Sequence, residues 1–256
     1  MFEGQKRRVL LVEDQALIAM NEKVILEKYG LDVEIAYNGE QAIRTAESCD
    51  DIHLILMDID LGNGMDGTEV ATHILNTREI PIVFLTSHSE REIVRKVKGI
   101  TRYGYVLKNS GEFVLIESIQ TAFELFDARQ RLAKSERKYR TMVDTAPMPF
   151  QSLNADGCLI DVNKAWLTTL GYERSRILGT WFGDLLAPEQ VELFRQRFPI
   201  FKARGHIEKV DFRLRRSDGS YINTVFNGCI AYREDGTFSH TVCIFQVVSA
   251  PDDFKG

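Results

Sequence analysis

The sequence has few cysteines, and no two of them have the spacing of metal ligands. The four, Cys49, Cys158, Cys229 and Cys243, are scattered over the chain. This distribution excludes a zinc-binding framework and predicts reduced thiols, mostly in the core of a cytoplasmic protein. Cys229 and Cys243 fall in two strand-like runs and could face each other, which alone does not predict a disulfide.

The sequence also lacks long apolar runs and an excess of positive charge. No apolar stretch reaches the length of a membrane span, and the charged segment 1–8 excludes a secretory signal. The 32 lysines and arginines against 37 aspartates and glutamates give a net charge of −5. Neither a membrane nor a nucleic acid is therefore expected as a partner. The 256 residues allow one large domain or two of ordinary size.

Four short apolar runs in the first half each end abruptly in polar residues. The runs and the residues that end them are 9–12 before Glu13 and Asp14, 52–57 before Asp58, 82–85 before Thr86, and 105–107 before Lys108. Such runs predict buried parallel strands. In open α/β sheets, ligands bind just outside the carboxyl ends of the strands. The sequence therefore predicts three carboxylates, a hydroxyl and an ammonium group at one edge of one sheet.

Helical patterns alternate with these strands. The expected helices lie after Asp14, at 39–48, at 68–76, at 89–98 and from about Ser110, and a further strand is expected at 33–36. Five strand–helix units in a row predict a parallel sheet with helices on both faces. The sequence thus predicts a five-stranded, flavodoxin-like α/β domain over residues 1–125.

From Glu112 to about Val143 the sequence has no strong helix breaker. Apolar residues recur there at heptad positions: Leu125, Leu132 and Tyr139, with Ala128 and Met142 near the intervening positions. This pattern predicts one long helix whose residues 126–140 form a linker with a two-stranded coiled-coil seam, and hence a homodimer. A solvated connector helix is the alternative, and acidic residues argue against a basic nucleic-acid arm.

Residues 141–249 show short strands joined by turns rather than alternating strands and helices. Strands are expected at 150–153, 158–162, 207–215, 221–231 and 238–248, with helices at 163–170, 175–178 and 188–202. Turn sequences such as Asp218-Gly219 join the later strands into hairpins. The pattern predicts an α+β domain with a five-stranded antiparallel sheet, followed by a tail at 250–256.

The carboxylates at the edge of the first sheet indicate a particular chemistry. Glu13, Asp14 and Asp58 at close range repel one another unless a cation neutralises them. Oxygen ligands select a hard cation, and Mg²⁺ is the usual one where a phosphate shares the site. One carboxylate could then attack phosphorus to give an acyl phosphate. The Lys108 ammonium and the Thr86 hydroxyl would contact the phosphoryl oxygens.

Residues 8 to about 125 resemble the receiver domain of two-component response regulators. The motifs that carry the resemblance are VLLVED at 9–14, LMDID at 56–60, MDG at 65–67, LTS at 85–87 and YVLK at 105–108. The resemblance implies that Asp58 is the phosphoacceptor. It also implies that Asp14 and Asp58 bind Mg²⁺ directly, that Glu13 binds it through water, and that the backbone carbonyl of Asp60 completes the ligands.

The same resemblance implies that Thr86 and Tyr105 form a switch pair, in which the hydroxyl moves toward the phosphoryl group and the ring fills the vacated space. The chain departs from the family pattern at two places. Asn109 follows Lys108 where the family usually has proline, so the geometry of that peptide bond is open. The glycine-rich loop at 61–64 looks about one residue longer than the commonest form.

Residues from about 135 to 248 resemble a PAS domain. The motifs are YRTMV at 139–143, DVNKAW at 161–166, LGY at 170–172, ILG at 177–179 and LRRSDGS at 214–220. Such domains sense small molecules, light or redox state, or pair proteins. No cysteine lies in a flavin-photoadduct motif, and helix 188–203 offers no histidine for haem, so the ligand is unassigned. Trp166, Trp181, Phe182 and Phe226 are expected in the core.

These features together predict a protein of two-component phosphorelay signalling. A histidine kinase or phosphotransfer protein would phosphorylate Asp58, and the long helix would carry the change to the PAS domain. No kinase, cyclase or helix-turn-helix pattern follows, so no enzyme is expected beyond self-phosphorylation and dephosphorylation. Two alternatives remain: the N-terminal receiver–PAS part of a hybrid sensor histidine kinase that continues after Gly256, and a Mg²⁺-dependent phosphatase that uses Asp58 and Asp60.

Overall fold

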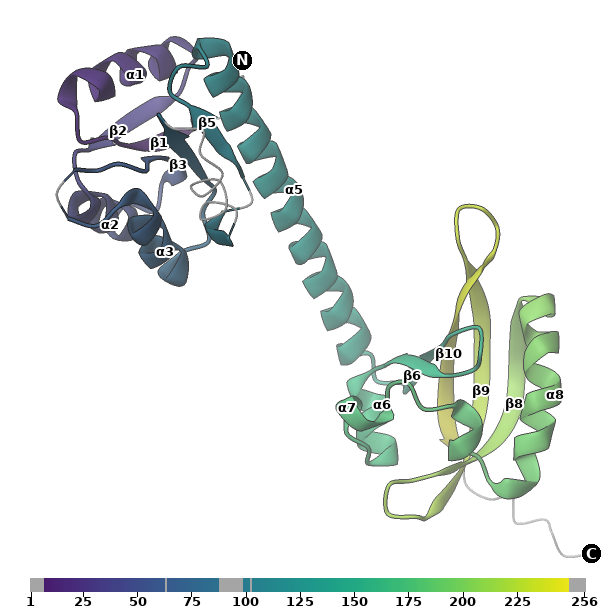
Figure 1. Ribbon diagram of the computed structural model, residues 1–256. Helices are drawn as coiled ribbons and strands as arrows, with labels where there is room; N and C mark the ends of the chain where they lie inside the picture. Colours follow the sequence, from purple (N-terminus) through teal and green to yellow (C-terminus); the bar gives the residue numbers. More distant parts are fainter. Residues whose placement is uncertain (1–6, 63, 88–98, 102, 249–256) are drawn as a thin grey trace, which may run out of the picture. The chain divides into compact units, whose positions relative to one another are not determined.

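The computed structural model describes residues 7–62, 64–87, 99–101 and 103–248 (Figure 1). The expected helix at 89–98 lies outside these residues. The chain divides into two compact units, Met1–Lys134 and Ser135–Gly256. Each unit is built around a five-stranded sheet of its own. No helix in the described ranges combines the length and the apolar character needed to cross a membrane.

The first unit contains a parallel sheet, as predicted. Its strands are β1 Arg8–Val12, β2 Asp32–Ala36, β3 Ile52–Asp58, β4 Ile82–Thr86 and β5 Tyr105–Leu107, in the order β2-β1-β3-β4-β5. The described helices are α1 Ala16–Lys28, α2 Gly39–Ser48, α3 Gly67–Thr77 and α5 Glu112–Thr145. The neighbouring strands are parallel throughout, which confirms the α/β class.

Apolar residues on both faces of this sheet explain its unbroken apolar runs. Leu10 and Val12 of β1 belong to the cluster that contains α2 and α3, whereas Val9 and Leu11 belong to the cluster that contains α1 and α5. Successive strand residues point to opposite faces, so a strand covered on both sides must be apolar at every position. All five residues of β4 are buried.

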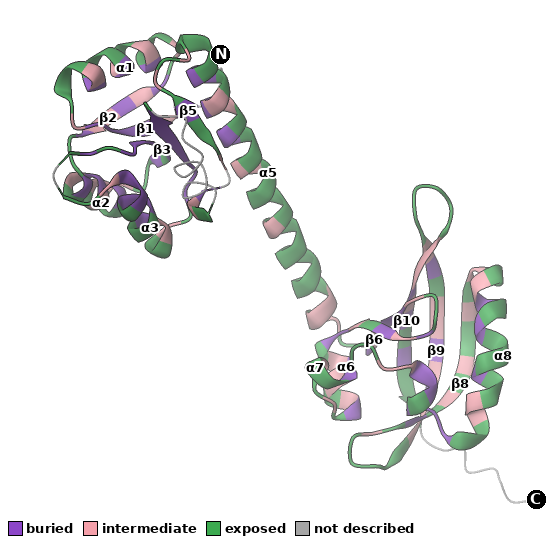
Figure 2. Ribbon diagram, viewed as in Figure 1, coloured by how far each residue is buried: buried purple, intermediate pink, exposed green. Residues whose placement is uncertain are grey.

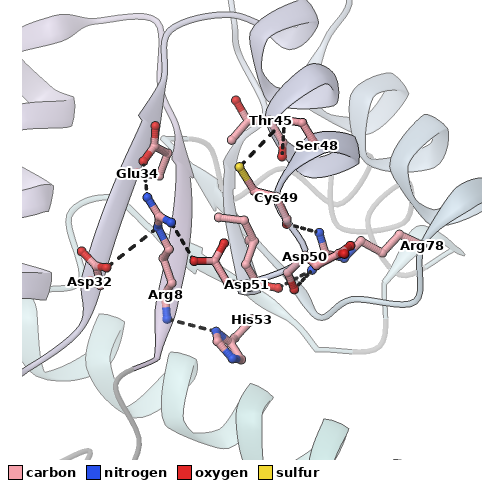
Figure 3. A network of polar contacts seen from close by, with 11 residues as sticks. Arg8, Asp32, Glu34, Thr45, Ser48, Cys49, Asp50, Asp51, His53 and Arg78 are labelled. Atoms are coloured by element: carbon pink, nitrogen blue, oxygen red, sulfur yellow. Dashed lines mark hydrogen bonds and ion pairs between the residues drawn. The ribbon is translucent and has the colours of Figure 1, made fainter.

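Two arginines bind the edge of this sheet where β1 and β3 begin (Figure 3). Arg8 at the start of β1 lies 2.7 Å from Asp51 and 2.8 Å from Glu34. Arg78 donates to four backbone carbonyls from the last turn of α2 to the first residue of β3, those of Ala46, Cys49, Asp50 and Ile52, at 2.6–2.8 Å. The last carbonyls of a helix have no partner within the helix, so Arg78 supplies donors at the end of α2.

Helix α5 is one continuous helix of 34 residues. Its first turns bury Leu115, Ile119 and Phe123 against the sheet. The Arg7 guanidinium lies 4.2 Å above the Phe123 ring and 2.7 Å from Asp127. Beyond Phe123 the surface of α5 is mostly exposed (Figure 2), and the side chains of Leu125, Leu132, Tyr139 and Met142 are each more than half exposed. The predicted long helix is therefore present, and its apolar stripe is exposed within the part of the chain that the structure describes.

The second unit is an α+β domain, as predicted. Its strands are β6 Phe150–Leu153, β7 Leu159–Val162, β8 His206–Arg215, β9 Tyr221–Tyr232 and β10 Phe238–Val248, in the order β7-β6-β10-β9-β8. Every pair is antiparallel. Helices α6 Lys164–Leu170, α7 Arg174–Ile177 and α8 Pro188–Arg204 lie between β7 and β8, with a short 3₁₀ turn, Phe182–Leu185, that the sequence did not indicate.

Aromatic side chains fill the core of the second unit. Trp166, Phe182 and Phe226 are fully buried, as expected, whereas Trp181 is half-buried. The two strand cysteines do not face each other: Cys229 pairs with Val242, and Cys243 pairs with Gly228. Adjacent pairs point to opposite faces of a sheet. A Cβ at Gly228 would lie 2.5 Å from the Cys243 sulfur, so glycine is needed there. Burial raises the pKa of the Cys243 thiol to about 12.

Candidate functional site

The carboxyl ends of β1 and β3 bring three carboxylates together. These strands are neighbours, so Glu13 and Asp14 after β1 lie beside Asp58 at the end of β3. Oxygen atoms of the three residues lie within 4.8 Å of one another. Glu13 is fully buried and Asp58 is 2% exposed. The juxtaposition that the apolar runs predicted is therefore present.

The Lys108 ammonium group lies within this cluster. Its Nζ donates to Glu13 Oε2 at 2.5 Å and to Asp58 Oδ2 at 2.7 Å. Burial alone would lower the pKa of Lys108, but the hydrogen bonds from its ammonium group to Asp58 and Glu13 outweigh burial and raise that pKa. Burial raises the pKa of Glu13 even though Lys108 opposes the shift. One cation thus faces three carboxylates, and the pocket keeps an excess of negative charge.

Asp14 carries the clearest sign that the cluster can hold a cation. Its Oδ1 is buried and has no hydrogen-bond partner among the described residues. A Cβ at Gly62 would lie 2.8 Å from Asp14 Oδ2, and Gly62 has a φ of +68°, so the backbone approaches the aspartate at a position that only glycine fills without strain. A set of carboxylate oxygens that includes an unpaired buried atom fits a hard divalent cation.

Asp60 lies at the rim of the same cluster. Its backbone N–H donates to Asp58 Oδ1 at 3.2 Å, and its side chain is exposed. Lys108 donates to the other carboxylate oxygen, Oδ2. The two hydrogen bonds together therefore fix the orientation of the Asp58 carboxylate. That the Asp60 carbonyl is a metal ligand stays a prediction.

Thr86 and Tyr105 lie on one face of neighbouring strands. Thr86 ends β4 and is 1% exposed, whereas Tyr105 begins β5 and is 38% exposed. Tyr105 pairs with Phe84 and Leu107 pairs with Thr86, so in these parallel strands the threonine and the tyrosine share a face. The two residues are thus placed as a switch pair requires, and the switching itself stays a prediction.

The turn after Lys108 is held by hydrogen bonds. The Lys108 amide donates to the Thr86 carbonyl, and the Ser110 amide donates to the Leu107 carbonyl, each at 2.9 Å. No peptide bond of the described residues is cis, so the bond between Lys108 and Asn109 is trans. The replacement of the family's proline by Asn109 is therefore accommodated with the lysine still directed at Asp58.

Glu22 on α1 is a residue that the sequence reasoning missed. It is 8% exposed, and its Oε2 has no hydrogen-bond partner in the described part of the chain. It lines a cavity of about 400 Å³ that Lys108 also lines. Burial, with the charges of Glu13 and Asp58, raises the pKa of Glu22 to about 7, and Lys108 only partly offsets this. Glu22 shares the buried face of α1 with Ala19 and Leu26, and a glutamate in such an apolar stripe was the available signal.

Glu22→Gln is expected to flatten the pH dependence of stability. A carboxyl whose pKa is raised in the folded state stabilises most below its ordinary pKa of 4.5, and this contribution is lost as the pH rises through 7. Relative to wild type, the variant should therefore gain about 2–3 kcal/mol between pH 5 and pH 8. Calorimetric unfolding at both pH values measures this. Glu27→Gln, an exposed site on the same helix, is the control, and an equal change in both variants would contradict the assignment.

The second unit contains a small apolar cavity that is partly open to solvent. It has a volume of about 80 Å³, and its lining includes Gln151, Leu153 and the rings of Phe182, Phe194 and Phe198. The Trp166 indole donates to the Gln151 side-chain oxygen at 2.9 Å. Because an indole N–H can only donate, the oxygen of Gln151 must face Trp166. The volume of the cavity is about half the ~150 Å³ of one that holds a benzene molecule.

Two family models match the chain. The response regulator receiver domain matches residues 9–120, and the PAS fold matches residues 137–248. The transcriptional regulatory protein PdtaR of Mycobacterium tuberculosis is 34% identical over 124 residues, 47% of this chain and 58% of PdtaR. The phyllosphere-induced regulator PhyR of Methylorubrum extorquens is 34% identical over 84 residues, 32% of either chain. The chain thus spans less than two thirds of either relative.

Solved structures include proteins similar to each unit. The N-terminal domain of a response regulator/sensory box/GGDEF three-domain protein from Carboxydothermus hydrogenoformans is 44% identical, with a TM-score of 0.46, over 48% of this chain and 98% of that one. The PAS domain of an HTR-like protein from Haloarcula marismortui is 20% identical, with a TM-score of 0.43, over 48% and 98%. With such TM-scores the assignment rests on the family models. Residues 9–120 are therefore a response regulator receiver domain, and residues 137–248 are a PAS domain.

Proposed function

We propose that the receiver domain accepts a phosphoryl group on Asp58 from a phosphohistidine of a histidine kinase or phosphotransfer protein. The observation that carries this proposal is the position of Lys108, whose ammonium bonds Asp58 at 2.7 Å in a pocket of excess negative charge. A purely structural ion pair would need one carboxylate, whereas this pocket contains three. Receiver family membership supports a signalling role of the two-component kind.

The reaction is a transfer between two nucleophiles. The bond from phosphorus to the histidine nitrogen breaks as a bond forms from phosphorus to a carboxylate oxygen of Asp58. The electron pair of the breaking bond stays on the imidazole nitrogen, which takes up a proton from solvent so that the histidine leaves as neutral imidazole. After the transfer, the Lys108 ammonium group bonds a phosphoryl oxygen instead of the Asp58 carboxylate. The Thr86 hydroxyl donates a hydrogen bond to another phosphoryl oxygen.

The same residues would hold Mg²⁺. Asp14 and Asp58 are the direct ligands in this proposal, with Glu13 acting through water and Asp60 through its carbonyl. The bound metal would supply positive charge that screens the incoming phosphoryl group. The unpaired Asp14 Oδ1 supports this assignment, because an unpaired buried oxygen is costly without a cation or a donor.

Phosphorylation would then shift the receiver domain between two populations. Thr86 and Tyr105 share one face of β4 and β5, so a movement of the hydroxyl toward the phosphoryl group can be followed by the ring. Helix α5 begins directly after the Lys108 turn and extends without a break to Thr145 in the second unit. We propose that this helix carries the change to the PAS domain.

A second copy of the chain is the partner that the α5 stripe fits. The residues of this stripe are Leu125, Leu132, Tyr139 and Met142, each more than half exposed. They recur at the a and d spacing of a heptad, which is the pattern of a two-stranded coiled coil. The charged residues between them belong to the outer positions of such a pair. We propose a homodimer along this stripe and through the PAS domain.

Leu132→Lys is expected to weaken self-association at least tenfold, because it puts a charge into the apolar seam. Sedimentation equilibrium at several concentrations measures the dissociation constant. Gln130→Lys adds the same side chain at an outer heptad position and should leave the constant unchanged. Equal constants for wild type and Leu132→Lys would discard the seam.

Incubation with Mg²⁺ and a small acyl phosphate, followed by intact mass measurement, tests the phosphoacceptor assignment. One added phosphoryl group is expected per chain. An unlabelled wild-type protein would argue against the proposed function.

A further inference from the structure

The side chain of Asn163 joins three parts of the second unit. It is fully buried. Its oxygen accepts hydrogen bonds from the backbone N–H groups of Phe150 and Trp166, each at 2.9 Å. Its nitrogen donates to the carbonyls of Val143, Ala146 and Met148 at 3.1, 3.4 and 2.9 Å. Asn163 therefore contacts the last turn of α5, the start of β6 and the first turn of α6.

The two ends of this amide have different tasks that cannot be exchanged. Backbone N–H groups only donate, so the oxygen must face Phe150 and Trp166, and carbonyls only accept, so the nitrogen must face Val143 and Met148. The final carbonyls of a helix have no partner within the helix. The nitrogen of Asn163 supplies a hydrogen-bond donor for the carbonyls at the end of α5, and its oxygen caps the start of α6.

A single residue, Trp166, connects the Asn163 amide to the lining of the PAS-domain cavity. Trp166, whose backbone N–H bonds Asn163, donates its indole N–H to Gln151. Gln151 lines the cavity and is 1% exposed. A continuous series of hydrogen bonds thus leads from the end of α5 through Asn163 and Trp166 to Gln151.

We propose that Asn163 is the positioning residue that couples the end of α5 to the core of the PAS domain. A rotation or unwinding of the last turn of α5 moves the carbonyls that Asn163 holds. The same rigid amide then shifts the first turn of α6 and, through Trp166, the wall of the cavity. The inference rests on the proposed function in one respect, namely that the signal arrives along α5.

The Asn163→Asp substitution separates coupling from folding. A carboxylate keeps both acceptor bonds, and aspartate caps helices as well as asparagine does. The aspartate carboxylate has no N–H to donate to the carbonyls at the end of α5, and it places a negative charge beside them. Asn163→Ser is the second variant, because its hydroxyl can still cap α6 but cannot reach both sides. Asn154→Asp is the matched control: Asn154 accepts from the amides of Asp156 and Cys158 in a turn of the same unit.

Tryptophan emission provides the readout, since both tryptophans, Trp166 and Trp181, lie in the PAS domain. The 256-residue chain is treated with Mg²⁺ and a small acyl phosphate, and intact mass reports how much is phosphorylated. Wild type and Asn154→Asp should show the same emission change per phosphoryl group. Asn163→Asp and Asn163→Ser should be phosphorylated to the same extent, with an emission change at least fivefold smaller. A change of wild-type size in both Asn163 variants would overturn the inference.

Hydrogen exchange without any phosphodonor gives an independent test. The amides of residues 140–146 should exchange at least tenfold faster in Asn163→Asp than in wild type, with the amides of α6 unchanged. Equal exchange at 140–146 would overturn the coupling, whatever the phosphorylation result. A wild type that takes up no phosphoryl group would instead reject the proposed function, and the exchange result would still decide the role of Asn163.

Discussion

Asp58→Asn is expected to abolish phosphoryl incorporation, with the fold retained. The amide cannot act as the nucleophile that forms an acyl phosphate. Its oxygen can still accept from Lys108, which lies 2.7 Å from Asp58 Oδ2, and Glu13 keeps its own bond to the same ammonium group. Removing one of three clustered carboxylates also relieves repulsion. Intact mass after treatment with Mg²⁺ and a small acyl phosphate should show wild type with one added phosphoryl group and the variant with none.

Asp60→Asn is the matched control, because it makes the same chemical change two residues away at an exposed side chain. Its backbone bond to Asp58 is unaffected, so labelling should be at the wild-type level. Equal labelling of Asp58→Asn and wild type would show that another residue accepts the phosphoryl group. Sustained hydrolysis of external phosphate esters that disappears in Asp60→Asn would instead favour the phosphatase alternative.

The strand ends could be predicted from the sequence because buried parallel strands impose a strong pattern. The runs 9–12 and 82–85 are buried on both faces, whereas the run 105–107 in the edge strand β5 buries only Val106. The first polar residue after each run lies at the carboxyl edge of the sheet. The juxtaposition of Glu13, Asp14, Asp58 and Lys108 follows from strand order alone. The long helix was equally predictable, because nothing between Glu112 and Thr145 interrupts it.

Other features depend on contacts between distant residues, for which a single sequence has no local signal. Whether Cys229 and Cys243 point to the same face of the sheet depends on the register of β9 and β10. A shift of one residue would move each side chain to the opposite face. The short turn Phe182–Leu185 packs against α8 through aromatic contacts such as that of Phe182 with Phe194. Asn163 reads in sequence as an ordinary helix cap, and its bonds to the end of α5 appear only in three dimensions.

The electrostatics of the acidic pocket connect its stability with its function. The Lys108 ammonium group holds Glu13 and Asp58 together. A bound divalent cation would take over this task and release the ammonium group for a phosphoryl oxygen. Lysine and metal thus neutralise the same charges, and their contributions to stability should substitute for each other.

Lys108→Gln is accordingly expected to destabilise the receiver domain strongly in EDTA and weakly in Mg²⁺. Loss of a cation that is only 13% exposed leaves buried carboxylates unpaired, which costs about 3–5 kcal/mol and lowers the melting temperature by roughly 10–20 °C. Saturating Mg²⁺ should restore most of this loss, so the metal-induced rise in melting temperature should be larger in the variant than in wild type. Circular dichroism follows both domains, whereas tryptophan emission follows only the PAS domain, so the receiver transition can be identified by difference.

Lys28→Gln provides the control for this comparison. Lys28 also forms an ion pair, with Glu112 at 2.9 Å, but their side chains are 62% and 44% exposed. Such surface pairs contribute at most about 1 kcal/mol, so this variant should melt close to wild type with and without Mg²⁺. If Mg²⁺ raised the melting temperature of wild type and Lys108→Gln by the same amount, the lysine and the metal would not share the carboxylates. The assignment of Asp14, Asp58 and Glu13 as a metal site would then lose its electrostatic basis.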